Sequence, residues 1–298
     1  MLGRILVLTG LFAVTTLGHA VTVYKYVDAN GVVTYTDKAV SGAKVFVIQD
    51  GMVERFEQQV KLETLKQKGQ HLLQIRNDLY APIDVELWFE RTKNVQTNHP
   101  AKTIRRVVPA RTTLTLATLR PLDSSERMQY TPKWRHGVGD PGAVPEGYRY
   151  ALPWQGGPFR ISQGANGRYS HFTPKGRYAV DIAMPEGTPI VAARAGRVIK
   201  VENSQTGRGS HPSGNFVRVL HDDGTMSVYL HLMRGSIQVQ EGQRVRLGQA
   251  LARSGNTGRS SGPHLHFVVQ RNVGLEIESI PFEFSQPVGQ LPNFAQGN

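Results

Sequence analysis

The sequence predicts an all-β protein with two or three domains. Segments rich in Val, Ile, Thr, Tyr and Phe recur along the chain, many with the apolar–polar alternation of half-exposed strands. Gly, Pro, Asn and Asp separate these segments at fairly regular spacing, as expected for turns between strands. The chain has 298 residues, and a single hydrophobic core rarely grows beyond this size.

Residues 1–20 are predicted to be a secretory signal peptide. Arg4 supplies a positive charge before a mostly apolar run from Ile5 to Leu17, and Gly18-His19-Ala20 offers small residues suited to cleavage. An uncleaved membrane anchor is the alternative, but the run is well short of the roughly 20 residues that span a bilayer. We therefore expect an exported protein with no transmembrane segment after signal cleavage.

Composition and charge limit the classes of partner. The chain has no Cys, which excludes disulfides and a lipidated N-terminal Cys, so packing must stabilise the fold. The formal net charge of +12 would ordinarily suggest nucleic acid as a partner. Export argues against nucleic acid and favours an anionic polymer of the cell envelope, with a merely basic surface as the alternative. The sequence leaves the oligomeric state unknown.

Residues 21–47 are predicted to form a small β-module. Two β-rich segments, 23–28 and 32–37, flank Asn30-Gly31, a dipeptide typical of tight hairpin turns. This segment resembles the short exported β-module of the DUF4124 type, whose function is unknown. A module of this size cannot hold a large core, so we expect it to pack on a neighbour.

Residues 48–150 are predicted to form a β-sandwich-like domain, because short strands separated by turn residues are typical of that architecture. The strand-like segments are 71–77, 83–89, 105–108 and 112–116. Residues 54–68 are polar with a weak helical period, which favours a short helix or a linker. His71, His99 and His136 are isolated from one another, so we expect surface or packing roles for them.

A stretch rich in Gly and Pro from Gly137 to Pro153 marks the next domain boundary, and the region 151–298 follows it. This region holds six of the ten histidines. Its most informative part is Pro263-His-Leu-His-Phe267, because a strand would place His264 and His266 on one face. Two such imidazoles suit a metal ligand beside a catalytic group, and without Cys a zinc site must use His and carboxylates.

Two other apolar segments carry polar side chains in strand-like positions. Asp181 is the single carboxylate within residues 178–183, and its burial would be costly unless it is paired or binds a metal. In residues 228–232, strict strand alternation predicts that Tyr229 and His231 share one face. Asp181 and His231 therefore join the candidate site residues.

Three segments of the region 151–298 together resemble one protein family. Residues 178–193 look like the first metal motif of the M23 family, the lysostaphin- or LytM-type zinc metallopeptidases. Residues 228–232 look like its central His-x-His motif with Tyr229 in the first position, and residues 248–267 look like its closing motif. The resemblance implies a LytM-type antiparallel β catalytic domain that holds one Zn²⁺.

The first metal ligand departs from the commonest pattern of this family, which places a His four residues before the Asp. That position is Arg177 here, and a guanidinium does not bind a metal ion. The nearest upstream His is His171, where a subgroup of the family with an inserted loop has its ligand. The resemblance therefore implies that His171, Asp181 and His266 bind the zinc ion.

Other histidines receive different roles. His211 and His221 are rivals for the first ligand position. His211 lies in a Gly/Ser-rich loop and is also a candidate accessory residue. His221 begins a turn and is expected to be structural. By resemblance, His231 and His264 are catalytic residues that do not bind the metal. We expect His264 to act as general base and His231 to stabilise the oxyanion. Tyr229 is a second candidate accessory residue, although strand packing also explains it.

The resemblance implies an exported zinc metalloendopeptidase that hydrolyses peptide cross-links of peptidoglycan. D-alanyl–diaminopimelate cross-links are the favoured substrate, and the periplasm or cell envelope of a Gram-negative bacterium is the expected location. One alternative is a non-catalytic relative that binds the wall or activates an amidase. Another is a non-haem iron oxygenase, which shares the ligand set but does not require two further histidines at the metal. Occlusion of the site by the preceding domain is a further hypothesis.

Overall fold

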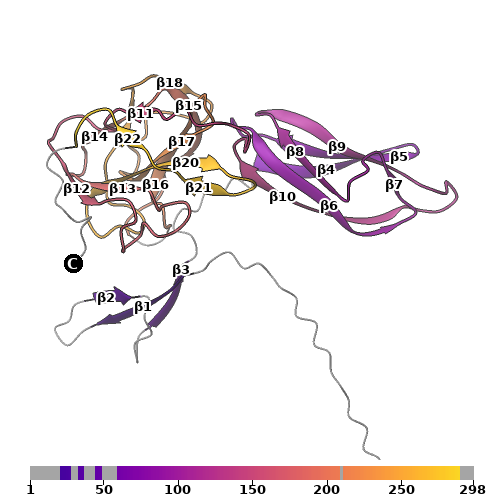
Figure 1. Cartoon of the computed structure of the whole chain (residues 1–298), viewed down its shortest axis with the longest axis horizontal. Helices are drawn as coiled ribbons and strands as arrows, with labels where there is room; N and C mark the ends of the chain where they lie inside the picture. Colours follow the sequence, from indigo (N-terminus) through magenta and orange to yellow (C-terminus); the bar gives the residue numbers. More distant parts are fainter. Residues whose placement is uncertain (1–20, 28–32, 37–43, 49–58, 209–210, 289–298) are drawn as a thin grey trace, which may run out of the picture. The chain divides into compact units, whose positions relative to one another are not determined.

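The regular elements of the described residues are all strands, which confirms the predicted all-β class (Figure 1). The computed structural model describes residues 21–27, 33–36, 44–48, 59–208 and 211–288. The chain divides into two compact units, residues 1–50 and 51–298. Within the described ranges, no helix has the length and hydrophobicity needed to cross a bilayer.

The first unit contains a three-stranded antiparallel sheet in the order β2-β1-β3. Its strands are β1 (Val21–Val27), β2 (Val33–Thr36) and β3 (Lys44–Ile48). β1 and β2 pair as the hairpin pattern predicts, with Tyr24 opposite Thr36. The expected Asn30-Gly31 turn lies outside the described residues. Strand β3, which the sequence pattern did not indicate, completes the sheet.

Residues 59–138 form two antiparallel sheets that share one core, as expected for a β-sandwich. One sheet has the order β4-β5-β9-β7 and the other has the order β10-β6-β8. The strands are β4 (Val60–Gln67), β5 (Gln70–Asn77), β6 (Ile83–Lys93), β7 (Gln96–Thr97), β8 (Thr103–Val108), β9 (Thr112–Arg120) and β10 (Gln129–Val138). Ile75 and Leu119 from the first sheet and Val85 from the second belong to the common core.

The prediction of a helix or linker at residues 54–68 is wrong for residues 60–67, which form β4. Val60 is the one fully buried residue of this strand, so β4 lacks the apolar alternation that identifies strands in a sequence. β4 nevertheless pairs with β5 along its whole length, from Val60 opposite Asn77 to Gln67 opposite Gln70. Pairing with a neighbouring strand therefore outweighs the weak local pattern.

The rest of the described chain is built around one large antiparallel sheet in the order β12-β13-β20-β17-β16-β15-β18, with β21 paired to β20. The strands are β12 (Arg160–Gln163), β13 (Val180–Ala183), β15 (Gly196–Glu202), β16 (Asn215–Leu220), β17 (Met226–Leu232), β18 (Arg244–Val245), β20 (His264–Asn272) and β21 (Ile277–Ser279). Two short pairs lie outside it: β14 (Pro189–Val191) with β19 (Ala250–Arg253), antiparallel, and β11 (Arg149–Tyr150) with β22 (Glu283–Phe284), parallel. The neighbouring strands β13, β20 and β17 carry the three polar segments that the sequence singled out.

The two faces of this large sheet carry different side chains. One face belongs to the main apolar core, which includes Ile182, Leu265 and Phe267. The other face carries a smaller apolar cluster: Ala179, Phe216, Val228, Leu230 and Val268. Because alternate residues of a strand face opposite sides, Asp181 and His266 lie on the second face. Here the alternation predicted for residues 264–267 agrees with the structure.

The sandwich and the large sheet share part of their core. Ile199, Met226 and Ile277 from the large sheet are buried together with the apolar side chains of the sandwich. In addition, the backbone N–H of Leu275 donates to a carboxylate oxygen of Asp84 at 3.0 Å. These contacts join residues 59–138 to the large sheet within the second compact unit.

This shared contact lies away from the candidate site. Asn272, at the last position of β20, donates its side-chain amide to the carbonyl of Gly139 at 2.9 Å. His264 is the first residue of the same strand, about 25 Å away at the usual rise per residue. The described contacts of residues 59–138 therefore argue against occlusion of the site by the sandwich.

Candidate metal centre and catalytic site

Adjacent strands bring Asp181 and His266 together. The antiparallel register places Asp181 of β13 opposite His266 of β20. Nδ1 of His266 lies 2.8 Å from Oδ1 of Asp181, and both residues are buried. A buried carboxylate in this position must be paired with positive charge or with hydrogen-bond donors.

His171 reaches the same carboxylate from the loop between β12 and β13. Its Nδ1 donates to the carbonyl of Gly164 at 2.7 Å, and its Nε2 lies 3.2 Å from Oδ1 of Asp181. The side chain of His171 is fully buried. Ligand atoms of His171, Asp181 and His266 all lie within 4.8 Å of one another. The structure thus brings the three predicted ligands into one group.

The donors and acceptors of this group fit a bound cation. Because Nδ1 of His171 donates to a carbonyl, the Nε2 of the neutral ring carries a lone pair, and it faces a carboxylate oxygen that can only accept. Two such acceptors repel unless a proton or a metal ion lies close to both. Nε2 of His266 is buried without a hydrogen-bond partner among the described residues, so His266 acts here through Nδ1. Two imidazoles and one carboxylate are a donor set that zinc accepts.

Gln163 holds the second oxygen of the same carboxylate. Its side-chain amide donates to Oδ2 of Asp181 at 2.9 Å and to the hydroxyl of Ser170 at 2.7 Å. Gly167 leaves the space that Gln163 occupies, because a Cβ atom at that position would overlap the Gln163 side chain. Gln163 therefore ties Asp181 to the loop that carries His171. Gln163 was not among the predicted site residues, because a single Gln in a short strand gives no signal of its contacts.

His264 lies beside this group with its Nε2 directed toward the carboxylate. Its Nδ1 donates to the carbonyl of Gly262 at 2.8 Å, and its Nε2 lies 3.7 Å from Oδ1 of Asp181. The side chain of His264 is 12% exposed, whereas that of His171 is fully buried. This placement suits a group that exchanges a proton with a molecule entering the site.

His231 reaches the site through an unusual backbone conformation. Its φ of 61° lies in the left-handed region, which residues other than Gly rarely adopt and which often marks functional sites. Its ring lies 4.7 Å from the ring of His264 and 5.9 Å from the ring of His266. Nδ1 of His231 donates to the carbonyl of Thr257 at 2.8 Å. Four imidazoles and one carboxylate therefore gather on one face of the sheet.

The prediction that Tyr229 and His231 share one face is wrong. Tyr229 is fully buried in the main core, with its ring 5.2 Å from that of Phe267. Its hydroxyl accepts a hydrogen bond from the backbone N–H of Ala193 at 2.8 Å. The left-handed backbone at His231, together with a register shift between β16 and β17, interrupts the strand alternation. Tyr229 therefore packs on the opposite face from His231.

The two rival histidines lie outside the metal-binding group identified among the described residues. His221 is buried, with Nδ1 donating to the carbonyl of Ala195 at 2.8 Å and Nε2 lying 3.0 Å from the hydroxyl of Ser227. These bonds fit the expected structural role of His221. His211 stacks on Phe216, a member of the cluster on the face that carries the site, and its buried Nδ1 has no partner within the described ranges. His211 stays a candidate accessory residue.

Burial and neighbouring groups determine the protonation of the site. Burial alone would raise the pKa of Asp181, but His266 and His171 outweigh it and hold that pKa well below its ordinary value. Burial lowers the pKa of His266, against the opposing effect of Asp181. Burial, reinforced by His264 and His266, lowers the pKa of His231 to about 3. An ionised carboxylate and neutral imidazoles are the forms that bind a divalent metal.

Comparison with known families identifies the part of the chain that carries this site. Residues 175–277 match Peptidase family M23, and residues 10–67 match a domain of unknown function, DUF4124. The chain therefore carries an M23 domain preceded by a DUF4124 domain, which confirms both resemblances. The M23 match includes Asp181 and the histidines of β17 and β20, but it begins after His171.

Individual proteins resemble the M23 part of the chain. Peptidoglycan DD-endopeptidase ShyA of Vibrio cholerae is 40% identical over 118 residues, which cover 38% of this chain and 25% of ShyA. Glycyl-glycine endopeptidase ALE-1 of Staphylococcus capitis is 36% identical over 91 residues, covering 30% of this chain and 23% of ALE-1. The crystal structure of a mutant catalytic domain of the prophage-encoded M23 protein EnpA from Enterococcus faecalis is 28% identical with a TM-score of 0.35, covering 44% of this chain and 94% of that one. The chain thus spans about a quarter of the length of ShyA and of ALE-1.

Proposed function

We propose that this chain is an exported zinc metalloendopeptidase that hydrolyses peptide cross-links of peptidoglycan, with D-alanyl–diaminopimelate cross-links as its substrate. The observation that carries the proposal is the convergence of three ligand atoms within 4.8 Å, with two further imidazoles beside them. The M23 match and a relative named as a peptidoglycan DD-endopeptidase support the reaction and the substrate class. The signal-like N-terminus and the net charge of +12 support a location in the anionic cell envelope of a Gram-negative bacterium.

His171, Asp181 and His266 would hold the zinc ion, through Nε2, Oδ1 and Nδ1 respectively. Zinc bound by such a set supplies the Lewis acidity that makes water acidic near neutral pH. Gln163 keeps Oδ1 of Asp181 directed toward the ligand group, because it occupies Oδ2 through a hydrogen bond of 2.9 Å.

His264 acts as the general base in this proposal. Its Nδ1 donates to Gly262, so the neutral ring presents the lone pair of Nε2 to the site. That atom accepts a proton from the attacking water and can then deliver it to the leaving amine.

His231 stabilises the negative charge that develops on the scissile carbonyl oxygen. Its Nδ1 already donates to Thr257, so the ring can donate to this oxygen from Nε2 only after Nε2 has taken up a proton from the solvent. Because burial lowers the pKa of His231 to about 3, this protonation is favourable only while negative charge develops next to the ring.

Substitutions with two readouts, zinc content and cleavage of purified cross-linked muropeptides, test these roles. His266→Ala and Asp181→Ala remove zinc and cleavage together. His264→Ala retains zinc but lowers the cleavage rate by about 100-fold or more, as expected for loss of a general base. His99→Ala changes a half-buried His of the sandwich and serves as the control with both readouts unchanged. Loss of zinc in the His264 variant as complete as in the His266 variant would contradict the assigned roles.

His171→Ala is the most informative single substitution, because the M23 match begins after this residue. We expect its zinc content to fall as far as that of the His266 variant. Unchanged zinc would assign the first ligand position to another group, with His211 the first to examine. A wild-type protein that binds zinc but cleaves no muropeptide would instead indicate the non-catalytic relative.

We also propose a functional division of the chain into a signal peptide (1–20), a small β-module (21–47), a β-sandwich-like domain (48–150) and the M23 domain (151–298). The end of the first compact unit at residue 50 supports the second boundary. Limited proteolysis of the exported protein should cut first between Ile48, where β3 ends, and Val60, where β4 begins, and a first cut inside a sheet would contradict the division.

A further inference from the structure

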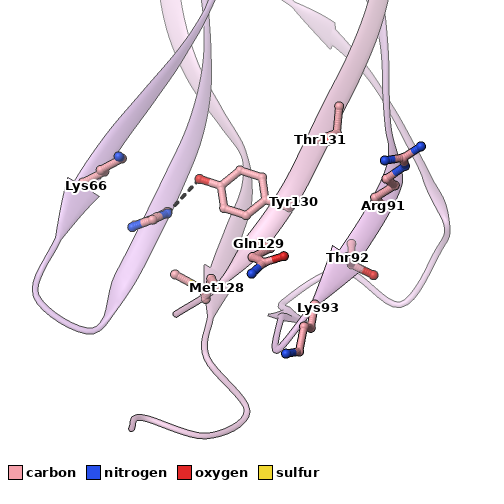
Figure 2. A pocket seen from close by; sticks show the side chains of 9 residues that line it. Lys66, Arg91, Thr92, Lys93, Met128, Gln129, Tyr130 and Thr131 are labelled. Carbon is pink, nitrogen blue, oxygen red and sulfur yellow. Dashed lines mark hydrogen bonds between the residues drawn. The ribbon is translucent and has the colours of Figure 1, made fainter. Parts of the chain in front are cut away.

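The β-sandwich carries a pocket that the proposed reaction does not use, with a volume of about 470 Å³ (Figure 2). The β4–β5 hairpin contributes Lys66 and His71, the end of β6 contributes Arg91 and Lys93, and the start of β10 contributes Tyr130. A pocket of this size can hold a small molecule or one unit of a polymer.

The pocket is strongly cationic. Lys66, Arg91 and Lys93 line it, and none of its lining residues is acidic. Lys66 and Arg91 form no ion pair with any described residue, whereas Lys93 lies 3.8 Å from the half-exposed carboxylate of Glu126. Residues 59–138 contain 14 Lys and Arg against 7 Asp and Glu. These charges favour an anionic ligand over a neutral one.

A hydrogen bond fixes one wall of this pocket. Nδ1 of His71 lies 2.7 Å from the hydroxyl of Tyr130, the hydrogen bond drawn as a dashed line in Figure 2, and the two rings meet edge to face. The ring of Phe89 also packs edge-on against Tyr130. Gln129 and Thr131 add an amide and a hydroxyl to the lining. The His71–Tyr130 pair is therefore held in place, whereas Lys66, Arg91 and Lys93 are exposed side chains that a ligand must order when it binds.

The pocket lies at the end of the sandwich away from the M23 domain. Asp84, near the start of β6, makes the contact with Leu275 of the M23 domain. Lys93, at the end of β6, lines the pocket and pairs with Gln129 of β10. The nine residue steps from Asp84 to Lys93 correspond to about 30 Å of strand. A ligand in the pocket therefore has no contact with the metal-binding group.

We propose that this pocket is a second peptidoglycan-binding site, which holds carboxylate groups of the stem peptides away from the bond that is cut. Guanidinium and ammonium groups beside amide and hydroxyl donors are suited to carboxylates. This proposal depends on the proposed function in one respect, the identity of the polymer as peptidoglycan. Since peptidoglycan repeats the same carboxylates many times, attachment through the sandwich raises the effective concentration of cross-links at the catalytic site.

Two triple variants with equal changes in net charge test this site. The pocket variant carries Lys66→Gln, Arg91→Gln and Lys93→Gln. The control variant carries Lys61→Gln, Lys102→Gln and Arg106→Gln, which are exposed residues of the sandwich outside the pocket lining. Both are made in the full chain with His264→Ala, so that the polymer is not digested during the measurement. Thermal unfolding shows whether each variant is folded, and Lys66→Gln alone replaces the triple pocket variant if that does not fold.

Cosedimentation with purified sacculi is the readout. We expect the pocket variant to bind sacculi about tenfold more weakly than its parent, because it loses a few charge-assisted contacts of modest strength. The control variant should bind as its parent does. Amidation of the sacculus carboxyls should lower binding of the parent to the level of the pocket variant. Equal binding by the pocket and control variants would overturn the proposal. The proposal would also be overturned if the pocket variant lost affinity only for phosphatidylglycerol vesicles or only for DNA.

A second readout separates this proposal from the proposed function. With His264 intact, the pocket variant should cleave small soluble muropeptides at the wild-type rate, because these substrates do not reach the pocket. A wild-type protein that cleaves no muropeptide would contradict the proposed function, while the sacculus measurement would still decide whether the pocket binds. Slower cleavage of soluble muropeptides by the pocket variant would place the pocket in the catalytic machinery and contradict the second-site assignment.

Discussion

Asp181 connects the side chains of the candidate metal centre. Its Oδ1 faces His171 and His266, and its Oδ2 accepts a hydrogen bond from Gln163. Because an amide holds one oxygen, the other stays directed toward the two imidazoles. Partners of this kind commonly change metal affinity by about 10–100-fold when they are removed.

Gln163→Ala should therefore weaken zinc binding by about tenfold while the fold is retained. The physical reason is that Asp181 gains freedom to rotate and the loop carrying His171 loses its tie through Ser170. Competition with a chelator measures the zinc affinity. Gln74→Ala is the matched control, because Gln74 bonds to Thr115 in the sandwich, far from the site. Equal affinities in the two variants would contradict the positioning role of Gln163.

The left-handed backbone of His231 predicts an unusual order of stability. At a φ of 61°, a Cβ atom costs about 1–2 kcal/mol, and this cost is absent for Gly. His231→Gly should therefore be at least as stable as His231→Ala. In an ordinary strand, the Gly variant would be less stable than the Ala variant. Urea unfolding of the two zinc-free proteins measures the difference. A clearly more stable Ala variant would argue against the left-handed conformation.

At the scale of elements, a close approach of two loops positions the carbonyl of Thr257, which accepts the hydrogen bond from His231. Gly258 follows Thr257 and has a φ of 77°, and a Cβ atom at Gly258 would overlap the backbone of Gly214. Gly258→Ala should cost more than the conformational strain of about 1 kcal/mol, because the two loops must also separate. The measurement is the free energy of unfolding in denaturant.

Gly248→Ala is the control for that substitution. Gly248 has a φ of 76°, close to that of Gly258, but a Cβ atom there would meet no atom within 4 Å. The Gly248 variant should therefore lose about 1 kcal/mol from strain alone, and it should retain zinc and activity. Equal losses of stability in the two variants would show that the approach to Gly214 does not matter.

The elements show how far local sequence patterns determine this fold. Residues 83–89 alternate clearly and lie in β6, and the pattern of residues 264–267 predicted the two faces of β20. β4 was missed because its side chains are mostly exposed and its strand state depends on pairing with β5. The face of His231 was predicted wrongly because strand alternation does not include a left-handed residue. The cationic pocket could not be predicted, since four separate strands contribute to it.

At the scale of the whole molecule, the sandwich and the M23 domain stabilise each other. Ile199, Met226 and Ile277 of the M23 domain are buried in the core of the sandwich. Deletion of residues 1–138 would expose these side chains at about 2 kcal/mol each. The shortened protein should therefore unfold at a lower temperature and should cleave muropeptides no faster than the full chain. Faster cleavage after the deletion would support occlusion of the site by the deleted part.

Acid should destabilise the folded molecule through His221. Burial, helped by Arg194, lowers the pKa of His221 to about 4 from 6.5. The unfolded chain takes up this proton near pH 6.5, whereas the folded chain does so only near pH 4. The contribution to stability is thus present above pH 6.5 and is lost as the pH falls toward 4, by up to about 1.4 kcal/mol per pH unit.

Urea unfolding between pH 7 and pH 4 measures this loss in the wild type and in His221→Gln. The variant lacks the titrating ring, so its free energy of unfolding should fall less steeply with decreasing pH. Other buried groups titrate in both proteins, and the difference between the two slopes isolates His221. Parallel curves for the two proteins would show that His221 does not cause the loss.

The central claim is that one metal ion is held by His171, Asp181 and His266, and X-ray diffraction at the zinc absorption edge tests it most directly. Crystals of the protein purified without chelators should give one strong anomalous peak in contact with Nε2 of His171, the carboxylate of Asp181 and Nδ1 of His266, with His231 and His264 beside it. An anomalous peak at other residues, or none at these three in a zinc-saturated crystal, would contradict the account.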